Sequence, residues 1–359
     1  MQRQIVLVMV SCLAASAFVC CKAAAQGAEA SCRPAAQAVR TLTAGSTEGP
    51  PPARPAPAPR NLAIAAIPGV VAAGGAWTRM WQQGGNSADG IIPDKDGTVL
   101  FAQEDYDAAL RLTADGKVTV AVGDSGGLSS LSMDRQGRLY GVHRTERVES
   151  TKPNKAAIVN AVSILAPQRS VLTDKWIDGA PLTVRPNDLA ADSRGGAFFT
   201  GGCLYYASPK GVSVVADNLR TNGIVFSPDD RTLYVTNGPT IVAFDVTAPG
   251  VLANRRDFTT LTAGGAGDGM AVDTEGRVYV SSGPGVQVFD RGGKYLGVIP
   301  TPRGIISIAF AGPDKKTLYA VGGGADDANG QPIREGPQKT AATIYRLQLL
   351  SQGLKDRAK

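Results

Sequence analysis

Polar side chains recur at one matching position in six copies of a short motif. The position lies two residues before the first strand residue of each copy and holds Asp89, Ser129, Asn187, Asn222, Asp268 and Ile306. Five of these residues are polar, and the two carboxylates and two amides form a set of oxygen ligands. Such a set suits a hard divalent cation such as Ca²⁺, whose remaining ligands would be waters. Two carboxylates would balance its charge.

Each motif copy is predicted to be a β-hairpin. A short apolar strand runs into a turn with Asp or Gly, and a second strand rich in Val, Leu, Phe and Tyr follows. The copies begin at Ile91, Leu131, Leu189, Ile224, Met270 and Ile308. In the plainest copies an Asp caps the turn and a Gly takes the positive-φ position, as in Asp134 and Gly137, Asp192 and Gly195, and Asp273 and Gly276.

The spacing of the copies predicts an all-β fold, a six-bladed β-propeller. The starts lie roughly 35 to 60 residues apart, as expected for four-stranded blades. A β-sandwich is the alternative, but sandwich strands do not carry one motif at matching positions. In a propeller, equivalent positions converge on one end of the central channel. The alternative for the polar residues is turn capping at Asp-Gly and Asn-Gly pairs, which gives no reason for a constant register.

The chain divides into three parts. Residues 1–25 resemble an export signal, with an apolar run over 5–19 and a small-residue cleavage site at 23–25. Residues 26–60 are rich in Ala and Pro and are predicted to form an extended tether. Residues 61–359 are predicted to be one propeller. We therefore expect an exported protein, periplasmic or secreted, whose apolar run is too short for a membrane span. A lipid-anchored form is less favoured.

Two of the five cysteines, Cys32 and Cys203, would remain after removal of the signal. They could pair in an oxidising compartment. The position of Cys32 in the tether and of Cys203 beside Gly202 argues against a bridge, and the question stays open. Two cysteines are too few for a zinc site built from thiolates.

The net charge of +6 does not indicate nucleic-acid binding. The excess lies in the signal, the tether and the last five residues, which leaves the predicted propeller close to neutral. The sequence of the predicted propeller therefore has no basic stripe of the kind that binds nucleic acid.

A GDSGG string at 123–127 resembles the signature of a serine hydrolase. The only histidine, His143, follows Ser125, whereas a trypsin-like site needs its His and Asp upstream. The G-x-S-x-G elbow needs a turn from strand to helix. A pair of Ser125 and His143 remains a weaker alternative to a glycine-rich loop between strands.

Three longer strings carry a family resemblance. They are RPNDLAADSRGG from Arg185, RTNGIVFSPDDRTLYVTNGP from Arg220 and GDGMAVDTEGRVYVSSGPGVQVFD from Gly267. With them, the stretch from about Ile67 to Lys359 resembles the senescence-marker-protein and gluconolactonase (regucalcin-like) family of calcium-dependent lactonases.

The resemblance implies roles for the ring residues. Asn222 and Asp268 match metal ligands, and Asp268 also matches the catalytic base. Asn187 matches a residue beside the metal and the substrate, and Arg185 matches a substrate contact. The family's first ligand is a Glu, and this chain has Asp89 there, one methylene shorter.

The combined site prediction has three groups. The metal ligands are Asp89, Asn187, Asn222 and Asp268; the catalytic residue is Asp268; and the substrate contacts are Arg185, Asn187, Asp188 and Ser129. Asp188 is also the alternative base.

We therefore expect a monomeric, metal-dependent lactonase for a sugar-type or related lactone. Ca²⁺ is the expected ion, with Zn²⁺, Mg²⁺ and Mn²⁺ as alternatives. The other function classes are a non-catalytic propeller that binds a ligand or partner, and a strictosidine-synthase-like condensing enzyme. Substrate choice is expected to depend on loops such as 146–155.

Overall fold

The structure is a computed structural model that describes residues 31–34, 62–83, 88–104, 108–144, 160–329, 331–333 and 342–355. For Ala88 and Asp89 it describes the backbone only. The predicted signal (1–25), most of the predicted tether (26–60) and the loop 146–155 lie outside the described residues. Within the described residues, no helix is both long enough and apolar enough to cross a membrane.

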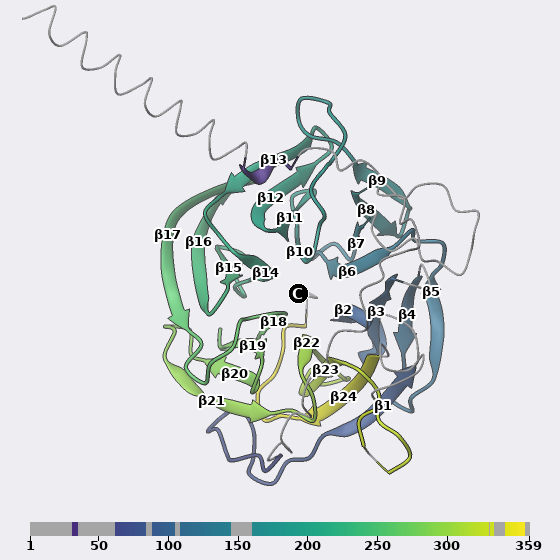
Figure 1. Cartoon of the computed structure of the whole chain (residues 1–359), viewed down its shortest axis with the longest axis vertical. Helices are drawn as coiled ribbons and strands as arrows, with labels where there is room; N and C mark the ends of the chain where they lie inside the picture. The colour runs from purple at the N-terminus through teal and green to yellow at the C-terminus, as the bar shows by residue number, and fades with distance from the viewer. Residues whose placement is uncertain are drawn as a thin grey trace, which may run out of the picture.

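Six four-stranded antiparallel sheets surround a central channel, which confirms the predicted six-bladed propeller (Figure 1). We number the blades in chain order. Blade 1 contains β2 (Ala88–Pro93), β3 (Val99–Gln103), β4 (Ala108–Leu112) and β5 (Val118–Val122), with the 3₁₀ turn η1 (Lys95–Gly97) between β2 and β3. Blade 2 contains β6 (Leu128–Met133), β7 (Leu139–His143), β8 (Ala161–Ala166) and β9 (Ser170–Thr173). Blade 3 contains β10 (Leu189–Asp192), β11 (Gly196–Gly201), β12 (Cys203–Ser208) and β13 (Gly211–Ala216).

The other three blades complete the ring. Blade 4 contains β14 (Thr221–Phe226), β15 (Thr232–Asn237), β16 (Thr240–Ala248) and β17 (Val251–Thr260). Blade 5 contains β18 (Met270–Val272), β19 (Val278–Ser282), β20 (Gly285–Phe289) and β21 (Tyr295–Pro300). Blade 6 contains β22 (Ile305–Ala311), β23 (Thr317–Gly323), β24 (Ala342–Gln348) and, from the other end of the chain, β1 (Thr78–Gln83).

The six motif copies form the first hairpin of each blade, with its first strand at the channel (Figure 1). The turn chemistry is as predicted. Asp134 Oδ1 accepts hydrogen bonds from the backbone N–H groups of Gln136 (3.0 Å) and Arg138 (2.9 Å), and Gly137 has φ = 77°. The Asp273 turn repeats this arrangement, and Asp192 caps its turn in the same way.

Strand β1 closes the ring. It pairs antiparallel with β24, so that Thr78 lies opposite Arg346 and Gln83 opposite Ala342. Without β1, the outer edge of β24 would present unpaired backbone groups. The ends of the described propeller are thus joined within one sheet.

The core lies between neighbouring blades. Ile91 and Phe101 of blade 1 pack in one cluster with Tyr319 and Val321 of blade 6, whereas Leu100 of blade 1 packs in another that includes residues of blade 2. Both faces of a blade are therefore buried. This explains why the inner strands read as continuous apolar runs instead of alternating ones.

Cys32 and Cys203 form a disulfide with a Cα–Cα distance of 5.8 Å. The interpretation from sequence that argued against this bridge is wrong. Cys32 is only 1% exposed, and its carbonyl oxygen accepts a hydrogen bond from Tyr205 Oη (2.8 Å). Arg33 lies over the Trp176 ring at 4.5 Å and pairs with Asp178 at 2.7 Å. The residues around Cys32 are thus docked on blade 3.

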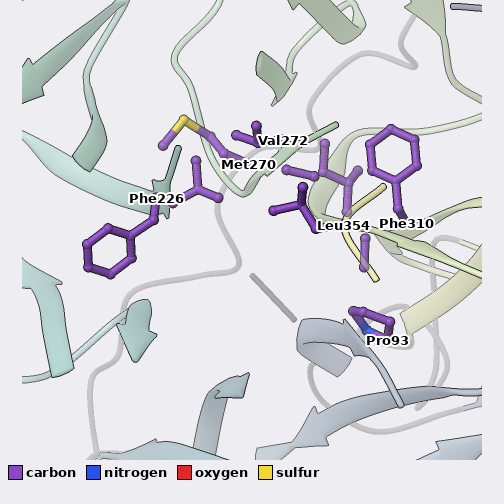
Figure 2. A pocket seen from close by; sticks show the side chains of 10 residues that line it. Pro93, Phe226, Met270, Val272, Phe310 and Leu354 are labelled. Carbon is purple, nitrogen blue, oxygen red and sulfur yellow. The ribbon is translucent and has the colours of Figure 1, made fainter. Parts of the chain in front are cut away.

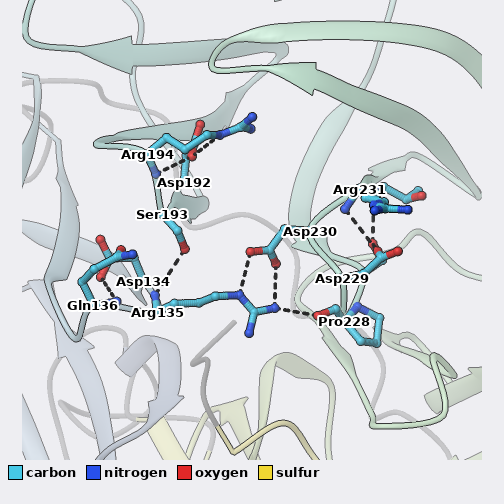
Figure 3. A network of polar contacts seen from close by, with 12 residues as sticks. Asp134, Arg135, Gln136, Asp192, Ser193, Arg194, Pro228, Asp229, Asp230 and Arg231 are labelled. Atoms are coloured by element: carbon cyan, nitrogen blue, oxygen red, sulfur yellow. Dashed lines mark hydrogen bonds and ion pairs between the residues drawn. The ribbon is translucent and has the colours of Figure 1, made fainter.

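The hairpin turns lie at one end of the channel, which we call the turn end. There, Arg135 of blade 2 reaches across the blade 3 turn to blade 4 (Figure 3). Its guanidinium contacts both carboxylate oxygens of Asp230 (2.8 and 3.3 Å) and donates to the carbonyl of Pro228 (2.6 Å), while its backbone N–H donates to Ser193 Oγ (3.3 Å).

The described C-terminal segment, residues 349–355, also lies at the turn end. Its backbone bonds to blades 5 and 6: Gly353 N–H donates to the Lys315 carbonyl, and Thr274 N–H donates to the Gln352 carbonyl, both at 2.8 Å. Figure 2 shows Leu354 among Met270, Val272, Phe310 and Pro93, which line an apolar pocket with it. Leu354 therefore packs at the turn end of the channel.

Candidate functional site

The six ring positions predicted from the motif meet at the end of the channel opposite the turns, which we call the mouth. Contacts link the neighbouring blades all the way around. Ser129 Oγ donates to the Asn187 carbonyl (3.3 Å), Asn187 Nδ2 donates to Asn222 Oδ1 (2.5 Å), and Gly269 N–H donates to the Ile306 carbonyl (2.8 Å). Ile91 N–H donates to Ser307 Oγ (3.4 Å), which joins blade 1 to blade 6.

Glycine follows three of the ring positions because the blades approach too closely there for a side chain. A Cβ on Gly90 would lie 2.4 Å from Ser130 Cα, and one on Gly223 would lie 1.9 Å from the Asp268 carbonyl oxygen. A Cβ on Gly269 would lie 2.8 Å from the Ile306 carbonyl oxygen. The Asp-Gly and Asn-Gly pairs are thus blade contacts, and the alternative explanation of them as turns is wrong.

Asp188 occupies the equivalent place in blade 3 and ties three blades together. Its Oδ1 accepts from Ser130 Oγ of blade 2 (2.6 Å) and from its neighbour Leu189 N–H (2.9 Å). Its Oδ2 accepts from Ile224 N–H of blade 4 (3.3 Å). The residue is only 7% exposed. Asp188 was predicted as a substrate contact or alternative base. In the structure, both of its carboxylate oxygens accept hydrogen bonds from residues of the ring.

Asn187 and Asn222 are half-buried at the mouth, and their backbones are held by hydrogen bonds to two threonines, Thr200 and Thr236. Thr200 Oγ1 donates to the Asn222 carbonyl (2.5 Å), and Asn222 N–H donates to Thr236 Oγ1 (3.1 Å). Asn187 N–H donates to the Thr200 carbonyl (2.7 Å). The structure therefore brings these two predicted ligands into direct contact and fixes both.

Asp268 is half-buried directly before β18. Its backbone N–H donates to the Ser281 carbonyl (2.9 Å), and its carbonyl packs against Gly223 of blade 4. Asp89 lies in β2, opposite Ala102, and its side chain is outside the described part of the chain. Both backbones are therefore placed on the ring by strand pairing and blade packing.

Ser129 differs from the other predicted contacts. It is fully buried, and its hydroxyl lies within hydrogen-bonding distance of the carbonyls of Val142 (3.4 Å) and Asn187 (3.3 Å). The structure places it beneath the mouth as a link between blades 2 and 3.

Arg185 lies at the mouth beside a residue that sequence reasoning missed. Its side chain is 42% exposed, and its Nη2 lies 3.9 Å from Oε1 of Glu104, whose side chain is 6% exposed. Glu104 directly follows β3 in the first motif copy. Glu104 could have been found from the sequence, because the end of the second strand of a hairpin lies at the same end of the channel as the start of the first.

The oxygen donors of the ring suit a hard cation. Among the described residues, no three His, Cys, Asp or Glu side chains gather into a group that could hold a metal ion. The predicted set instead relies on amide oxygens of Asn187 and Asn222 beside Asp268. Amide and carboxylate oxygens are ligands that Ca²⁺ accepts readily, so this donor set fits the expected ion.

Ser125 and His143 do not form a catalytic pair in the described structure. Ser125 Oγ and His143 Nε2 are both buried, and neither atom has a hydrogen-bond partner among the described residues. Burial lowers the pKa of His143, which keeps the imidazole neutral at pH 7. The GDSGG string is therefore a connection between β5 and β6.

Comparisons with known proteins agree with this architecture. Residues 156–322 match the family model described as the SMP-30/Gluconolactonase/LRE-like region. A pentonolactonase of Haloferax volcanii is 30% identical over 187 residues, which cover 47% of this chain and 64% of that protein. A gluconolactonase of Zymomonas mobilis is 27% identical over 184 residues, covering 42% and 51%. The lactonohydrolase oryL of Aspergillus oryzae is 33% identical over 150 residues, and the match covers 34% of its length.

Solved structures match over more of the chain. A gluconolactonase from Xanthomonas campestris superposes with a TM-score of 0.60 at 24% identity, covering 81% of this chain and 95% of that one. A calcium-binding regucalcin from Agrobacterium tumefaciens has a TM-score of 0.59 at 19% identity, covering 78% and 96%. At these identities the structural matches establish the fold.

Proposed function

We propose that this chain, which matches the SMP-30/Gluconolactonase/LRE-like family model over residues 156–322, hydrolyses lactones at the mouth of its channel. The observation that carries this proposal is the continuous contact between blades that brings Asn187, Asn222 and Asp268 to one end of the channel. Side chains from separate blades meet there on a rigid scaffold, which is how catalytic groups are held in position.

Asp89, Asn222 and Asp268 would hold a divalent cation, Ca²⁺ in the first instance, with Asn187 beside it. A cation held there would polarise the lactone carbonyl and stabilise the oxyanion of the tetrahedral intermediate. The Asn187 Nδ2 bond to Asn222 Oδ1 fixes the orientation of the Asn222 amide. That fixed geometry favours Asn222 as a ligand, because a side chain that is already ordered loses less conformational freedom on binding.

Asp268 is the proposed base. Its carboxylate would take a proton from the attacking water as the water oxygen bonds to the carbonyl carbon. The ring C–O bond of the lactone then breaks, and the leaving alkoxide receives a proton to give the hydroxy acid. We prefer Asp268 to Asp188, because both oxygens of Asp188 accept hydrogen bonds within the ring.

We also propose that the protein is exported and acts as a monomer outside the cytoplasm. The Cys32–Cys203 bridge supports an oxidising compartment, where such bonds form and persist. The signal-like composition of residues 1–25 supports the same location.

The test combines metal removal with a substitution. Hydrolysis of glucono-1,5-lactone would be followed by proton release for the metal-loaded protein, the chelated protein and Asp268→Asn. We expect chelation to abolish activity and Asp268→Asn to lower kcat by about 100-fold or more, the usual contribution of a general base. Asp245→Asn, on the outer strand pair of blade 4, is the matched control and should keep full activity.

Unchanged hydrolysis after chelation would exclude the metal role, and full activity of Asp268→Asn would exclude the base. A protein that binds the metal but hydrolyses no aldonolactone would instead be a binding propeller.

A further inference from the structure

The contact between Glu104 and Arg185 spans a whole blade. Glu104 follows β3 of blade 1, and Arg185 precedes β10 of blade 3. Blade 2 lies between them, since β6 packs against both β2 and β10 (Figure 1). The two side chains, 3.9 Å apart at Nη2 and Oε1, therefore meet over the mouth end of blade 2.

Blade 2 itself contributes no ring side chain to the mouth. Its ring residue, Ser129, is fully buried, and its hydroxyl points to two backbone carbonyls. Among the described residues, the Glu104–Arg185 pair is a polar group on this side of the mouth, and it is supplied by the two neighbouring blades.

The burial of the pair is unequal. The Glu104 side chain is 6% exposed and that of Arg185 is 42% exposed. Burying a charged carboxylate this deeply has a large desolvation cost, which a neighbouring cation offsets. The charge of Arg185 is therefore balanced by the more deeply buried Glu104, while part of the Arg185 side chain stays exposed to solvent.

This balance bears on substrate choice. An arginine without a counter-charge binds carboxylates and phosphates strongly, because its planar fork matches their geometry. Glu104 places a negative charge next to that fork, so an anionic substrate would meet repulsion there. A hydroxyl group carries no charge and still accepts hydrogen bonds from the guanidinium.

We propose that Glu104 determines substrate specificity, making the mouth favour neutral polyhydroxylated lactones over lactones that carry a carboxylate or phosphate. This inference rests on the proposed lactonase function and names the substrate class of the same site. Specificity of this kind comes from repulsion of the wrong ligand as well as attraction of the right one.

Two lactones with the same ring provide the test. Glucono-1,4-lactone ends in a hydroxymethyl group, and glucaro-1,4-lactone ends in a carboxylate. The readout is the ratio of kcat/KM for the neutral lactone to that for the acidic one. We expect wild type to prefer the neutral lactone, and Glu104→Gln to lower the ratio by about tenfold, equivalent to about 1.4 kcal/mol. Added salt should reduce the difference, because the charges lie at a partly exposed surface.

Three further variants make the result specific. Glu104→Asp keeps the charge and should keep the wild-type ratio, and Arg185→Gln removes the cation and should raise the ratio further. Glu275→Gln, at the turn end beside Arg277, is the matched control and should change nothing. If Glu104→Gln fails to fold, the wild-type ratio itself decides the matter, because an arginine whose charge is not opposed by Glu104 would favour the acidic lactone.

The two proposals fail in different ways. If wild type hydrolyses the neutral lactone and the ratio is the same in Glu104→Gln, the specificity role is wrong and the lactonase function stands. The same conclusion holds if wild type prefers the acidic lactone. If wild type hydrolyses neither lactone, the proposed function is wrong, and calorimetric binding of the two lactones then decides the role of Glu104 by the same ratio.

Discussion

His143, the only histidine of the chain, ends β7 near the mouth and is 6% exposed. Burial lowers its pKa, and contacts with the backbone of Gly126 and Ser125 offset part of this effect. The imidazole is therefore neutral in the folded state and more readily protonated in the unfolded chain. A neutral, buried histidine of this kind contributes to packing and makes stability depend on pH.

The sign of that dependence follows from linkage. The pKa of His143 is near 6.5 in the unfolded chain and lower in the folded protein. The unfolded state therefore binds more protons, and the stability present above the unfolded pKa is lost as pH falls through it. Between about pH 7 and 5 we expect the free energy of unfolding to decrease by at most about 1.4 kcal/mol per pH unit.

Urea unfolding at several pH values in this range, for wild type and His143→Gln, would measure the effect. The carboxyl groups whose pKa is lowered, such as Asp229, titrate below this range and should not contribute. An equal pH slope in the two proteins would contradict the assignment to His143.

At the scale of elements, the closest approach on the ring lies between β14 and the segment entering β18. Gly223 leaves room for the Asp268 carbonyl, and Asp268 is the proposed base. The geometry of the site thus depends on how tightly blades 4 and 5 pack. At the turn end, the contacts of Arg135 hold blades 2 and 4 together in a comparable way.

Gly223→Ala should therefore impair both stability and activity. Its Cβ would lie 1.9 Å from the Asp268 carbonyl oxygen, so one of the two backbones must move. We expect a loss of about 1–3 kcal/mol in the free energy of unfolding, the usual cost of overpacking. Lactone hydrolysis should fall as well, because Asp268 is displaced.

Thermal unfolding and the lactone assay would measure the two effects of Gly223→Ala. Gly304→Ala is the control, since its Cβ would have no heavy atom of the described residues within 4 Å. A Gly223→Ala protein with the melting temperature and activity of Gly304→Ala would show that the blades can separate without loss.

For the whole molecule, two long-range links hold the ring and its N-terminal segment together. Strand β1 completes blade 6, and the disulfide ties Cys32 to Cys203 across a sequence separation of 171 residues. The disulfide is covalent and therefore also restricts the unfolded chain, whereas the pairing of β1 with β24 acts only in the folded state.

Removing the disulfide should lower stability by about 2–5 kcal/mol, since a loop of this length has a large closure entropy. The experiment compares urea unfolding of wild type, with and without reducing agent, with that of the Cys32→Ser/Cys203→Ser variant. We expect reduced wild type to match the variant, and the variant itself to be insensitive to reductant. A midpoint for oxidised wild type equal to that of the variant would contradict a stabilising bridge.

The amino-acid sequence is sufficient to predict the repeated architecture. The alternation of apolar strand, Asp-capped turn and second strand is local chemistry, and turns such as Asp134–Gly137 form as that chemistry requires. Six such hairpins in one register implied six blades and a ring of equivalent positions. Asn187 and Asn222 could be assigned to the same ring in advance, because equivalent positions in a propeller lie at the same height along the channel.

Which distant segments contact each other is seen only in the folded structure. Nothing in the local pattern joins Cys32 to Cys203, β1 to β24, or Glu104 to Arg185, because each contact depends on how the blades are placed around the axis. The same holds for Asp188, whose carboxylate lies between blades 2 and 4. The repeated motif predicts the strands and the number of blades. Contacts between distant segments depend on three-dimensional packing, about which the repeat carries no information.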